Sequence, residues 1–159
     1  MYINSLIQNS KFKIQNSRLL KNISIRRITF RVLTGLRTNK IKMNLVQDKS
    51  YRFSVRLLNL QQQLINNKKD LTLFRQLLRS GTSIGANITE AQGAQSQKDF
   101  ILKMSIAQKE AKESNYWIRL FTETGFIDHN TGVEMLNEIN LIDKVLSKIL
   151  ITAKKNLRG

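Results

Sequence analysis

Basic residues at helical spacing are the feature of this sequence that best predicts chemistry. Ammonium and guanidinium groups bind phosphates, and an aromatic ring among them can stack on a base. Three rows share this pattern, and their members are Lys109, Lys112, Tyr116 and Arg119; Lys49, Arg52 and Arg56; and Lys144, Lys148 and Lys155. The rows predict a surface that binds RNA or DNA. The alternative is that they are solvated faces of helices, with Glu110 and Glu113 diluting the charge of the first row.

The residues needed for catalysis or for metal binding are scarce. The chain has no cysteine and one histidine, His129, so thiolate and His-rich metal sites are excluded. Asn87, Glu90 and Glu113 fit either an acid–base site or a hydrogen-bond network that fixes the register of helices or subunits. The network is favoured, because no nucleophile with a neighbouring base accompanies these residues. We therefore expect no enzymatic activity, no cofactor and no metal.

Two glycines, Gly81 and Gly85, lie within a predicted helix. Each costs about 1 kcal/mol relative to alanine, so this helix is expected to pack closely on a neighbour or to bend. A phosphate-binding loop would need a preceding strand and a suitably spaced lysine, which this stretch lacks. We predict that Gly81 and Gly85, together with Ser83, Asn87 and Glu90, have structural roles.

The positive charge is concentrated near the N-terminus. The 159 residues carry a formal net charge of +16, yet residues 1–42 hold ten basic residues and no acid. Residues 1–42 fit a disordered or untranslated leader before Met43, a basic arm that binds nucleic acid, or a transit peptide. The folded domain is predicted to span residues 43–159. No apolar run reaches the roughly 18 residues of a membrane span, so we expect a cytoplasmic protein without a membrane partner.

Four helices are predicted from apolar residues that recur in alternating steps of four and three. They are expected over about residues 48–66, 71–93, 97–125 and 131–155, without a proline to interrupt them. The predicted inward-facing rows are Tyr51, Val55, Leu58, Leu64 and Ile65; Phe74, Leu77, Gly81, Ile84, Ile88 and Ala91; Phe100, Met104, Ala107, Ala111, Ser114, Ile118 and Phe121; and Met135, Ile139, Ile142, Leu146, Ile149 and Ala153. Because short connections make successive helices antiparallel, the predicted fold is all-α, an antiparallel up-down-up-down four-helix bundle preceded by a basic, disordered leader.

Capping and turn residues mark the predicted helix ends. The expected N-terminal caps are Asp70 for the second helix, Ser96 with Asp99 for the third, and Thr131 with Glu134 for the fourth. At the C-terminal ends, Gly93 and Gly125 are expected to adopt the left-handed conformation. Phe126 is then expected to fold back on Phe121.

The centre of the sequence resembles a known family. The motif Ser83-Ile84-x-x-Asn87-Ile88-x-Glu90 follows Leu77-Leu78-Arg79-Ser80 and precedes Lys98-Asp99-Phe100 and the positions Ala107, Glu110, Glu113 and Trp117. This pattern is similar to the bacterial four-helix-bundle proteins encoded by intervening sequences in large-subunit ribosomal RNA genes. The resemblance covers about Val46 to Lys155. Ala91 stands where that family commonly has glycine and Gly85 where it often has proline, so the bend of the second helix does not carry over.

The resemblance implies a homo-oligomer, specifically a homopentameric ring. It also implies kinship with the accessory variability protein of diversity-generating retroelements, whose relatives are basic rings that bind nucleic acid and associate with a reverse transcriptase. The expected partners are therefore other copies of this chain and RNA or DNA. The alternative function is a protein-interaction scaffold that docks a reverse transcriptase or another nucleic-acid enzyme. The cellular role of the intervening-sequence branch is not established.

Overall fold

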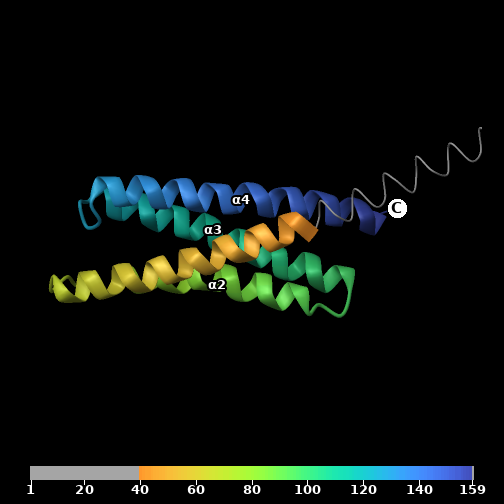
Figure 1. Cartoon of the computed structure of the whole chain (residues 1–159), viewed down its shortest axis with the longest axis horizontal. Coiled ribbons are helices and arrows are strands. Elements are labelled where there is room, and N and C mark those ends of the chain that lie inside the picture. Colours follow the sequence, from red (N-terminus) through yellow and green to blue (C-terminus); the bar gives the residue numbers. More distant parts are fainter. Residues whose placement is uncertain (1–39, 159) are drawn as a thin grey trace, which may run out of the picture. The chain divides into compact units, whose positions relative to one another are not determined.

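A bundle of four antiparallel helices makes up the part of the chain that the structure, a computed structural model, describes, residues 40–158 (Figure 1). The first helix spans residues 40–66 and is called helix 40–66 below. It is followed by α2 (Phe74–Gln92), α3 (Gln97–Glu123) and α4 (His129–Arg158). Successive helices reverse direction at short connections, so the predicted all-α, up-down-up-down fold is confirmed.

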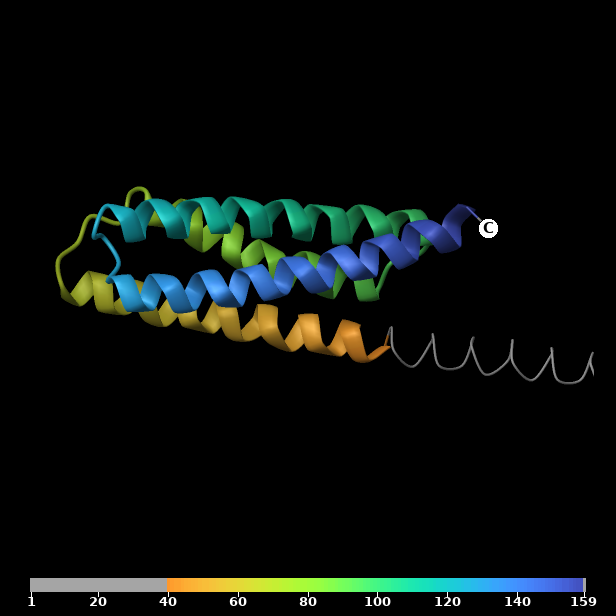
Figure 2. The same ribbon diagram turned by 90° about the horizontal axis from the view of Figure 1, so that it is seen from above.

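Each helix packs against two neighbours. α2 lies against α3, and α3 lies against α4. Helix 40–66 closes the bundle, because Gln47 is hydrogen-bonded to Gln92 of α2 and Arg56 is hydrogen-bonded to Glu134 and Glu138 of α4. The order around the bundle is therefore helix 40–66, α2, α3, α4 (Figure 2). In this order the face formed by α3 and α4 lies on the side away from helix 40–66 and α2.

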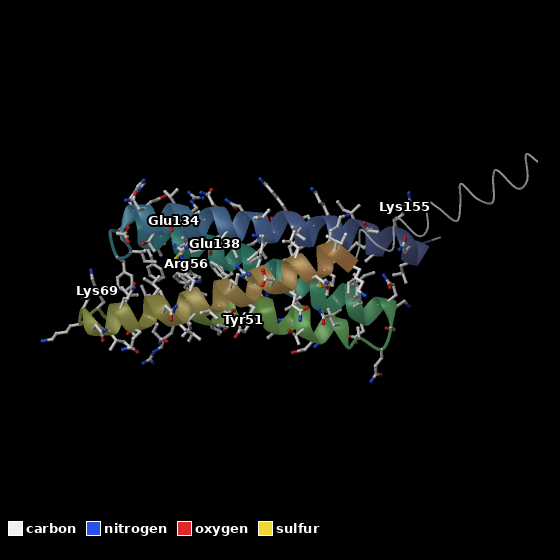
Figure 3. The ribbon with its side chains drawn as sticks, in the orientation of Figure 1. Tyr51, Arg56, Lys69, Glu134, Glu138 and Lys155 are labelled. Carbon is white, nitrogen blue, oxygen red and sulfur yellow. The ribbon has the colours of Figure 1, made fainter. Side chains whose placement is uncertain are left out.

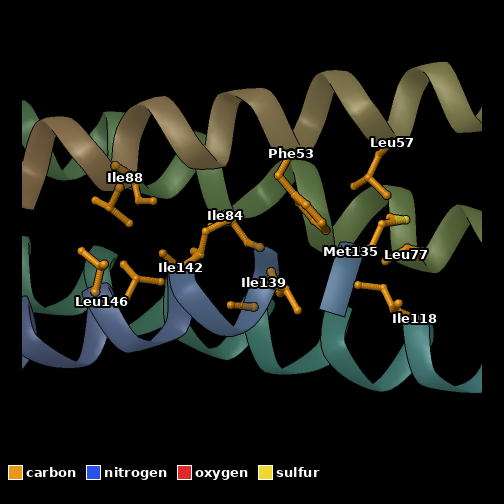
Figure 4. Packing of buried hydrophobic residues seen from close by; sticks show 14 of the residues in the cluster. Phe53, Leu57, Leu77, Ile84, Ile88, Ile118, Met135, Ile139, Ile142 and Leu146 are labelled. Carbon is orange, nitrogen blue, oxygen red and sulfur yellow. The ribbon is translucent and has the colours of Figure 1, made fainter. Parts of the chain in front are cut away.

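Apolar side chains from all four helices meet along the middle of the bundle (Figure 4). The inward-facing rows predicted for the second, third and fourth helices are buried, with Phe100 only partly so. Each fully buried aliphatic or aromatic side chain contributes about 1.5–3 kcal/mol relative to an exposed one. The core therefore holds all four helices in one arrangement and fixes which faces remain outside.

The predicted inward face of helix 40–66 is wrong except at Leu64, which is buried. Tyr51, Val55, Leu58 and Ile65 are 69%, 39%, 52% and 49% exposed. The buried apolar residues of this helix are Val46, Phe53, Leu57, Leu60 and Leu64. Both rows have helical spacing, but the polar Gln62 interrupts the exposed row, whereas the buried row supplies one phenylalanine and three leucines in unbroken steps. The core takes the row with the larger continuous apolar surface, and helix 40–66 keeps a second apolar row outside.

The N-terminal limit of the first helix also differs from the prediction. Helix 40–66 already includes residues 40–47, whereas its expected start lay near residue 48. The predictions about the leader concern residues 1–42, of which residues 1–39 lie outside the described part. None of the described helices is both long enough and apolar enough to cross a membrane.

The predicted N-terminal cap is confirmed at α3, and the predicted caps of α2 and α4 are wrong. Ser96 Oγ accepts a hydrogen bond from the backbone N–H of Asp99 at 3.1 Å, as predicted. Asp70 accepts hydrogen bonds from Thr72 inside the connection, and α2 begins only at Phe74 without a side-chain cap. At α4 the expected pair of Thr131 and Glu134 is replaced by Asp128.

Asp128 starts α4 two residues earlier than predicted. Its Oδ1 accepts a hydrogen bond from the backbone N–H of Thr131 at 3.0 Å, and Glu134 instead bonds Arg56. A carboxylate is a stronger acceptor than a hydroxyl and is further stabilised by the helix dipole. The nearby acid therefore decides where this helix begins.

The two predicted glycine C-caps have different outcomes. Gly125 has a φ of +67°, so its predicted left-handed conformation is confirmed. Phe126 folds back on Phe121 as predicted, with the two ring centroids 5.0 Å apart. Gly93 has a φ of −91°, so the left-handed conformation predicted for it is wrong. The backbone N–H of Gly93 still satisfies the end of α2 by bonding the carbonyl of Glu90.

Candidate nucleic-acid interface

Two of the three basic rows predicted from the sequence lie on exposed sides of α3 and α4. Lys109, Lys112 and Arg119 of α3 are exposed, and so is Tyr116 between them. The α4 members of this face, also exposed, are Lys144, Lys148 and Lys155; Lys155 is labelled in Figure 3. The residues at this surface are named the α3–α4 face below. These cations are exposed because the opposite sides of the two helices are buried, at Ala107 and Ala111 in α3 and at Ile142 and Leu146 in α4.

Polar side chains join α3 to α4 along this face. Gln108 donates hydrogen bonds to Asp143 Oδ1 at 2.9 Å and to Ser147 Oγ at 2.6 Å. Asn115 donates to Asn140 at 3.0 Å. These residues were not predicted from the sequence, although Gln108 and Asn115 stand seven positions apart and therefore share one side of α3. The bonds fix the register of the two helices and so the spacing between their basic rows.

Most cations of the α3–α4 face are free of local acids. Within residues 40–158, none of Lys109, Lys112, Lys144, Lys148 and Lys155 forms an ion pair. Arg119 approaches Glu123 at 3.8 Å, and both of those side chains are well exposed. A solvent-exposed pair of this kind contributes little, so the face keeps nearly all of its positive charge.

Of the two acids expected to dilute the first basic row, one is buried and the other is paired with a cation of α2. Glu110 points into the bundle and is 8% exposed. Glu113 lies on the α2 side of α3, where it bonds Arg79 at 2.9 Å. The carboxylate that remains beside the lysines is that of Asp143, and it accepts the hydrogen bond from Gln108. The structure therefore favours a positive α3–α4 face more strongly than the sequence does.

One acid of this region has an incomplete hydrogen-bond set. Among the described residues, Oε2 of Glu110 is the buried side-chain atom that lacks a partner. Its neighbour in the next turn, Ser114, donates to the backbone carbonyl of Glu110 and shares a hydrogen bond with Ser80 of α2. Burial of an unpaired carboxylate oxygen lowers stability, so Glu110 weakens the bundle rather than contributing to the surface.

The third basic row, on helix 40–66, is in a different environment. Arg56 donates to Glu138 and Glu134 of α4, each at 2.7 Å (Figure 3). Partial burial alone would lower the pKa of Arg56, but the hydrogen bonds and charges of Glu134 and Glu138 outweigh it and raise the pKa. Arg52 pairs with Asp48 at 3.1 Å. The structure thus uses Arg56 to join two helices. Lys49 is half-buried and has no ion-pair partner among the described residues, so this row differs from the α3–α4 face chiefly at Arg56.

The polar residues of the α2 motif have local and interhelical roles. Asn87 donates to the backbone carbonyl of Ser83 at 2.8 Å, within the same helix. Glu90 forms an ion pair with Lys103 of α3, and this contact raises the pKa of Lys103 through a hydrogen bond and charge attraction. No arrangement of an acid, a base and a nucleophile emerges among these described residues. The pairs Glu90–Lys103 and Arg79–Glu113 join α2 to α3 and fix how the two helices pack.

The two glycines of α2 face helix 40–66. A Cβ on Gly81 would overlap the side chain of Leu57 and lie 3.1 Å from Cε1 of Phe53, so the two helices approach closely here. Gly85 lies one turn further along, 3.6 Å from Ser50 Oγ by the same measure. The small side chains leave an outward groove of about 660 Å³ between helix 40–66 and α2, with Tyr51 at its edge. The sequence did not predict this groove.

Metal binding has no evident site in the described part of the chain. Across residues 40–158, no three His, Cys, Asp or Glu side chains come together in a way that would hold an ion.

The chain is similar to known proteins both in sequence and in structure. Residues 42–148 match the family model described as "23S rRNA-intervening sequence protein". A crystal structure of a protein with unknown function from the S23 ribosomal protein family of Bacteroides thetaiotaomicron is 47% identical and superposes with a TM-score of 0.66. That match covers 69% of this chain and 97% of the other. A search of curated proteins finds no match.

Proposed function

Because the chain belongs to the 23S rRNA-intervening sequence protein family, we propose that it is a non-enzymatic, self-associating bundle that binds RNA or DNA in the cytoplasm. The observation that carries this proposal is the α3–α4 face, whose five lysines have no ion-pair partner among the described residues. Neither the family description nor the similar crystal structure specifies an activity, and the cellular role is a separate question.

The spacing of the cations suits a sugar–phosphate backbone. Lys109 and Arg119 are separated by roughly 15 Å along α3, and Lys144 and Lys155 by roughly 16 Å along α4, at 1.5 Å per residue. The bonds from Gln108 to Asp143 and Ser147 place Lys109 and Lys144 at about the same level, and the two rows extend from there in opposite directions along the bundle. Together they can contact several phosphates of one nucleic-acid segment at the same time. Each contact releases condensed counterions, which is the main source of affinity for such a surface.

The chemistry of the face favours contacts with the backbone over readout of base sequence. Lysine ammonium groups bind phosphates as point charges and do not distinguish bases. Tyr116 is 59% exposed at the edge of the face and could stack on an unpaired base. We therefore expect little sequence preference.

The proposal is tested by titrating fluorescent RNA, single-stranded DNA and duplex DNA of equal length with the full chain at several salt concentrations. Fluorescence anisotropy should show binding whose log affinity falls linearly with log salt concentration. A matched sample with Lys112→Ala, Lys144→Ala and Lys148→Ala should reduce that slope by roughly 3, about 1 per lost phosphate contact. Absence of binding at low salt, or an unchanged slope in the variant, would contradict the proposal.

The alternative is a scaffold that docks a larger partner, such as a reverse transcriptase or another nucleic-acid enzyme. The exposed apolar row of helix 40–66 favours this reading, because a surface of this kind commonly contacts protein. A pull-down that survives nuclease treatment and fails with Tyr51→Ser and Leu58→Ser would support the scaffold. Capture that disappears with nuclease would instead leave nucleic-acid binding as the sufficient function.

A further inference from the structure

Two exposed rows on different helices have the same spacing and opposite charge patterns. On helix 40–66 the outward row is Ile41, Leu45, Asp48, Arg52 and Val55. On α3 the outward row is Leu102, Ile106, Lys109, Glu113 and Tyr116. Both follow steps of four, three, four and three, and each residue of the first row stands 61 positions before its counterpart. Such steps keep a row on one side of a helix, so two rows of this kind can pack lengthwise.

The large apolar members of both rows are accessible. Ile41, Leu45 and Val55 are 58%, 40% and 39% exposed, and Leu102 and Tyr116 are 57% and 59% exposed. Ile106 and Glu113 are half-buried, and the charged residues at the centre of each row are otherwise exposed. Within one copy the rows cannot meet, because helix 40–66 and α3 lie diagonally across the bundle from each other.

The two rows match residue by residue when they are laid side by side in parallel. Ile41 then lies against Leu102, and Leu45 lies against Ile106. The central positions bring Asp48 opposite Lys109 and Arg52 opposite Glu113, and Val55 meets Tyr116 at the end. Apolar residues therefore face apolar residues, and both charged positions face a charge of opposite sign. This chain supplies both halves, which identifies a second copy of itself as the occupant.

We propose that the row on helix 40–66 of one copy packs in parallel against the row on α3 of a second copy. The inference rests on the self-association in the proposed function and does not depend on nucleic-acid binding. Helix 40–66 and α3 run in the same direction within the bundle (Figure 1), so a rotation that keeps neighbouring bundles roughly parallel also keeps the two rows parallel. The contact is head-to-tail, because each copy offers a different surface to each neighbour; repetition gives a closed ring or an open filament.

Existing ion pairs within one chain do not prevent this contact. Asp48 pairs with Arg52, and their side chains are 55% and 77% exposed. The exposed pair of Asp48 and Arg52 contributes little, so it can be exchanged for pairs between copies. Glu113 pairs with Arg79, and their side chains are 29% and 59% exposed. Its contacts with Arg79 and Trp117 both use Oε1, so Oε2 can accept from Arg52 of the second copy while the pair with Arg79 remains. Lys109 and Tyr116 then belong to the subunit contact, while Lys112, Arg119 and the α4 lysines remain available to nucleic acid.

The test is a charge exchange, with self-association of the full chain measured by sedimentation equilibrium in the absence of nucleic acid. Asp48→Lys and Lys109→Asp each place like charges opposite each other and should weaken association about tenfold or more. The double variant restores an opposite pair and should return the association constant to within about threefold of the original. Lys154→Asp, a charge reversal on α4 outside both rows, should associate like the original chain.

Circular dichroism confirms that each variant is folded, and a second pair of variants examines the apolar positions independently. Leu102→Ser should weaken association, whereas Ile151→Ser, which alters an even more exposed residue on α4, should not. Unchanged association in both charge variants would overturn the inference, and so would weakened single variants that the double variant does not restore. A monomeric original chain would overturn both this contact and the proposed self-association, while the salt titration decides nucleic-acid binding separately.

Discussion

Basic rows on two sides of the bundle look alike in the sequence and behave differently in the structure. On the α3–α4 face, Lys112, Lys144 and Lys148 are exposed and have no ion-pair partner among residues 40–158. On helix 40–66, Arg56 is held between two glutamates of α4, and Arg52 is paired with Asp48. The difference at Arg56 comes from Glu134 and Glu138, which the fold brings near it, whereas Asp48 is a neighbour of Arg52 within one helix.

The comparison shows that the number of cations on a helix does not measure the charge it offers to a ligand. Arg56 stabilises the packing of helix 40–66 on α4, and its guanidinium is already neutralised. The lysines of the α3–α4 face do not pair with an acid within the described chain, since Glu110 is buried and Glu113 is bound by Arg79. An attraction for phosphates is therefore expected from one side of the bundle and not from the other.

The largest expected effect comes from reversing charge on each side in turn. Lys144→Glu combined with Lys148→Glu should weaken RNA binding roughly thirtyfold or more, because two phosphate contacts become repulsive. A control variant on helix 40–66, Lys49→Glu, changes a cation outside both rows of the proposed subunit contact and should change affinity by less than about threefold. Anisotropy titrations at one fixed salt concentration measure both. Equal losses from the two sides would remove the distinction between the faces.

A second change separates stability from binding. Arg56→Ala leaves Glu134 and Glu138 without their partner and removes the packing of the arginine stem, so the free energy of unfolding should fall by about 1–2 kcal/mol. RNA affinity of the folded variant should stay close to that of the original chain. Chemical denaturation and anisotropy measure the two quantities. A loss of affinity without a loss of stability would assign Arg56 to the binding surface instead.

A third pair of variants asks which acid opposes nucleic-acid binding. Asp143→Asn removes the negative charge beside the lysines and keeps an oxygen that can accept from Gln108, so RNA affinity should rise roughly two- to threefold. Glu110→Gln removes the same charge inside the bundle, on the side of α3 away from that face, and should leave affinity nearly unchanged. If both changes raise affinity equally, the orientation of Glu110 does not matter to the surface charge.

The smallest effect concerns the start of α4, which supports both faces. Hydrogen bonds from the side chain and backbone of Thr131 lower the pKa of Asp128 below its ordinary value. A lowered pKa in the folded state means that the ionised cap stabilises the fold above the unfolded pKa, near 4, and that this contribution is lost as pH falls through the folded pKa. Asp128→Asn should therefore show a slightly smaller loss of melting temperature on acidification below pH 4 than the original chain. An identical acid profile in both proteins would show that this cap does not contribute to acid stability.

The rows of α2, α3 and α4 could be predicted from the sequence because each of these helices has one continuous apolar row. Helix 40–66 has a second apolar row that is broken at Gln62, and helical spacing alone does not decide which row the core takes. Phe53 and Leu57 fill space against Gly81 and the other helices, so the choice depends on volume in three dimensions. The start of α4 differed for a local reason, since an aspartate just before the predicted cap competes for the same backbone N–H groups.

The candidate site could be predicted only in part. The residue types and their helical spacing identified Lys109, Lys112, Lys144 and Lys148 as surface cations, and all four are exposed. The pairing of Arg56 with residues some eighty positions away has no signature in local spacing. For this reason the row on helix 40–66 looked equivalent to the others in the sequence.

By itself, the sequence determined that this protein forms long amphipathic helices joined by short connections, because helix periodicity and the absence of proline act locally along the chain. It also set an excess of positive charge. Only the tertiary structure decided which apolar row of helix 40–66 is buried and which cations remain free. Both outcomes depend on contacts between helices distant in the chain, where packing volume and the approach of opposite charges select among faces that are locally equivalent.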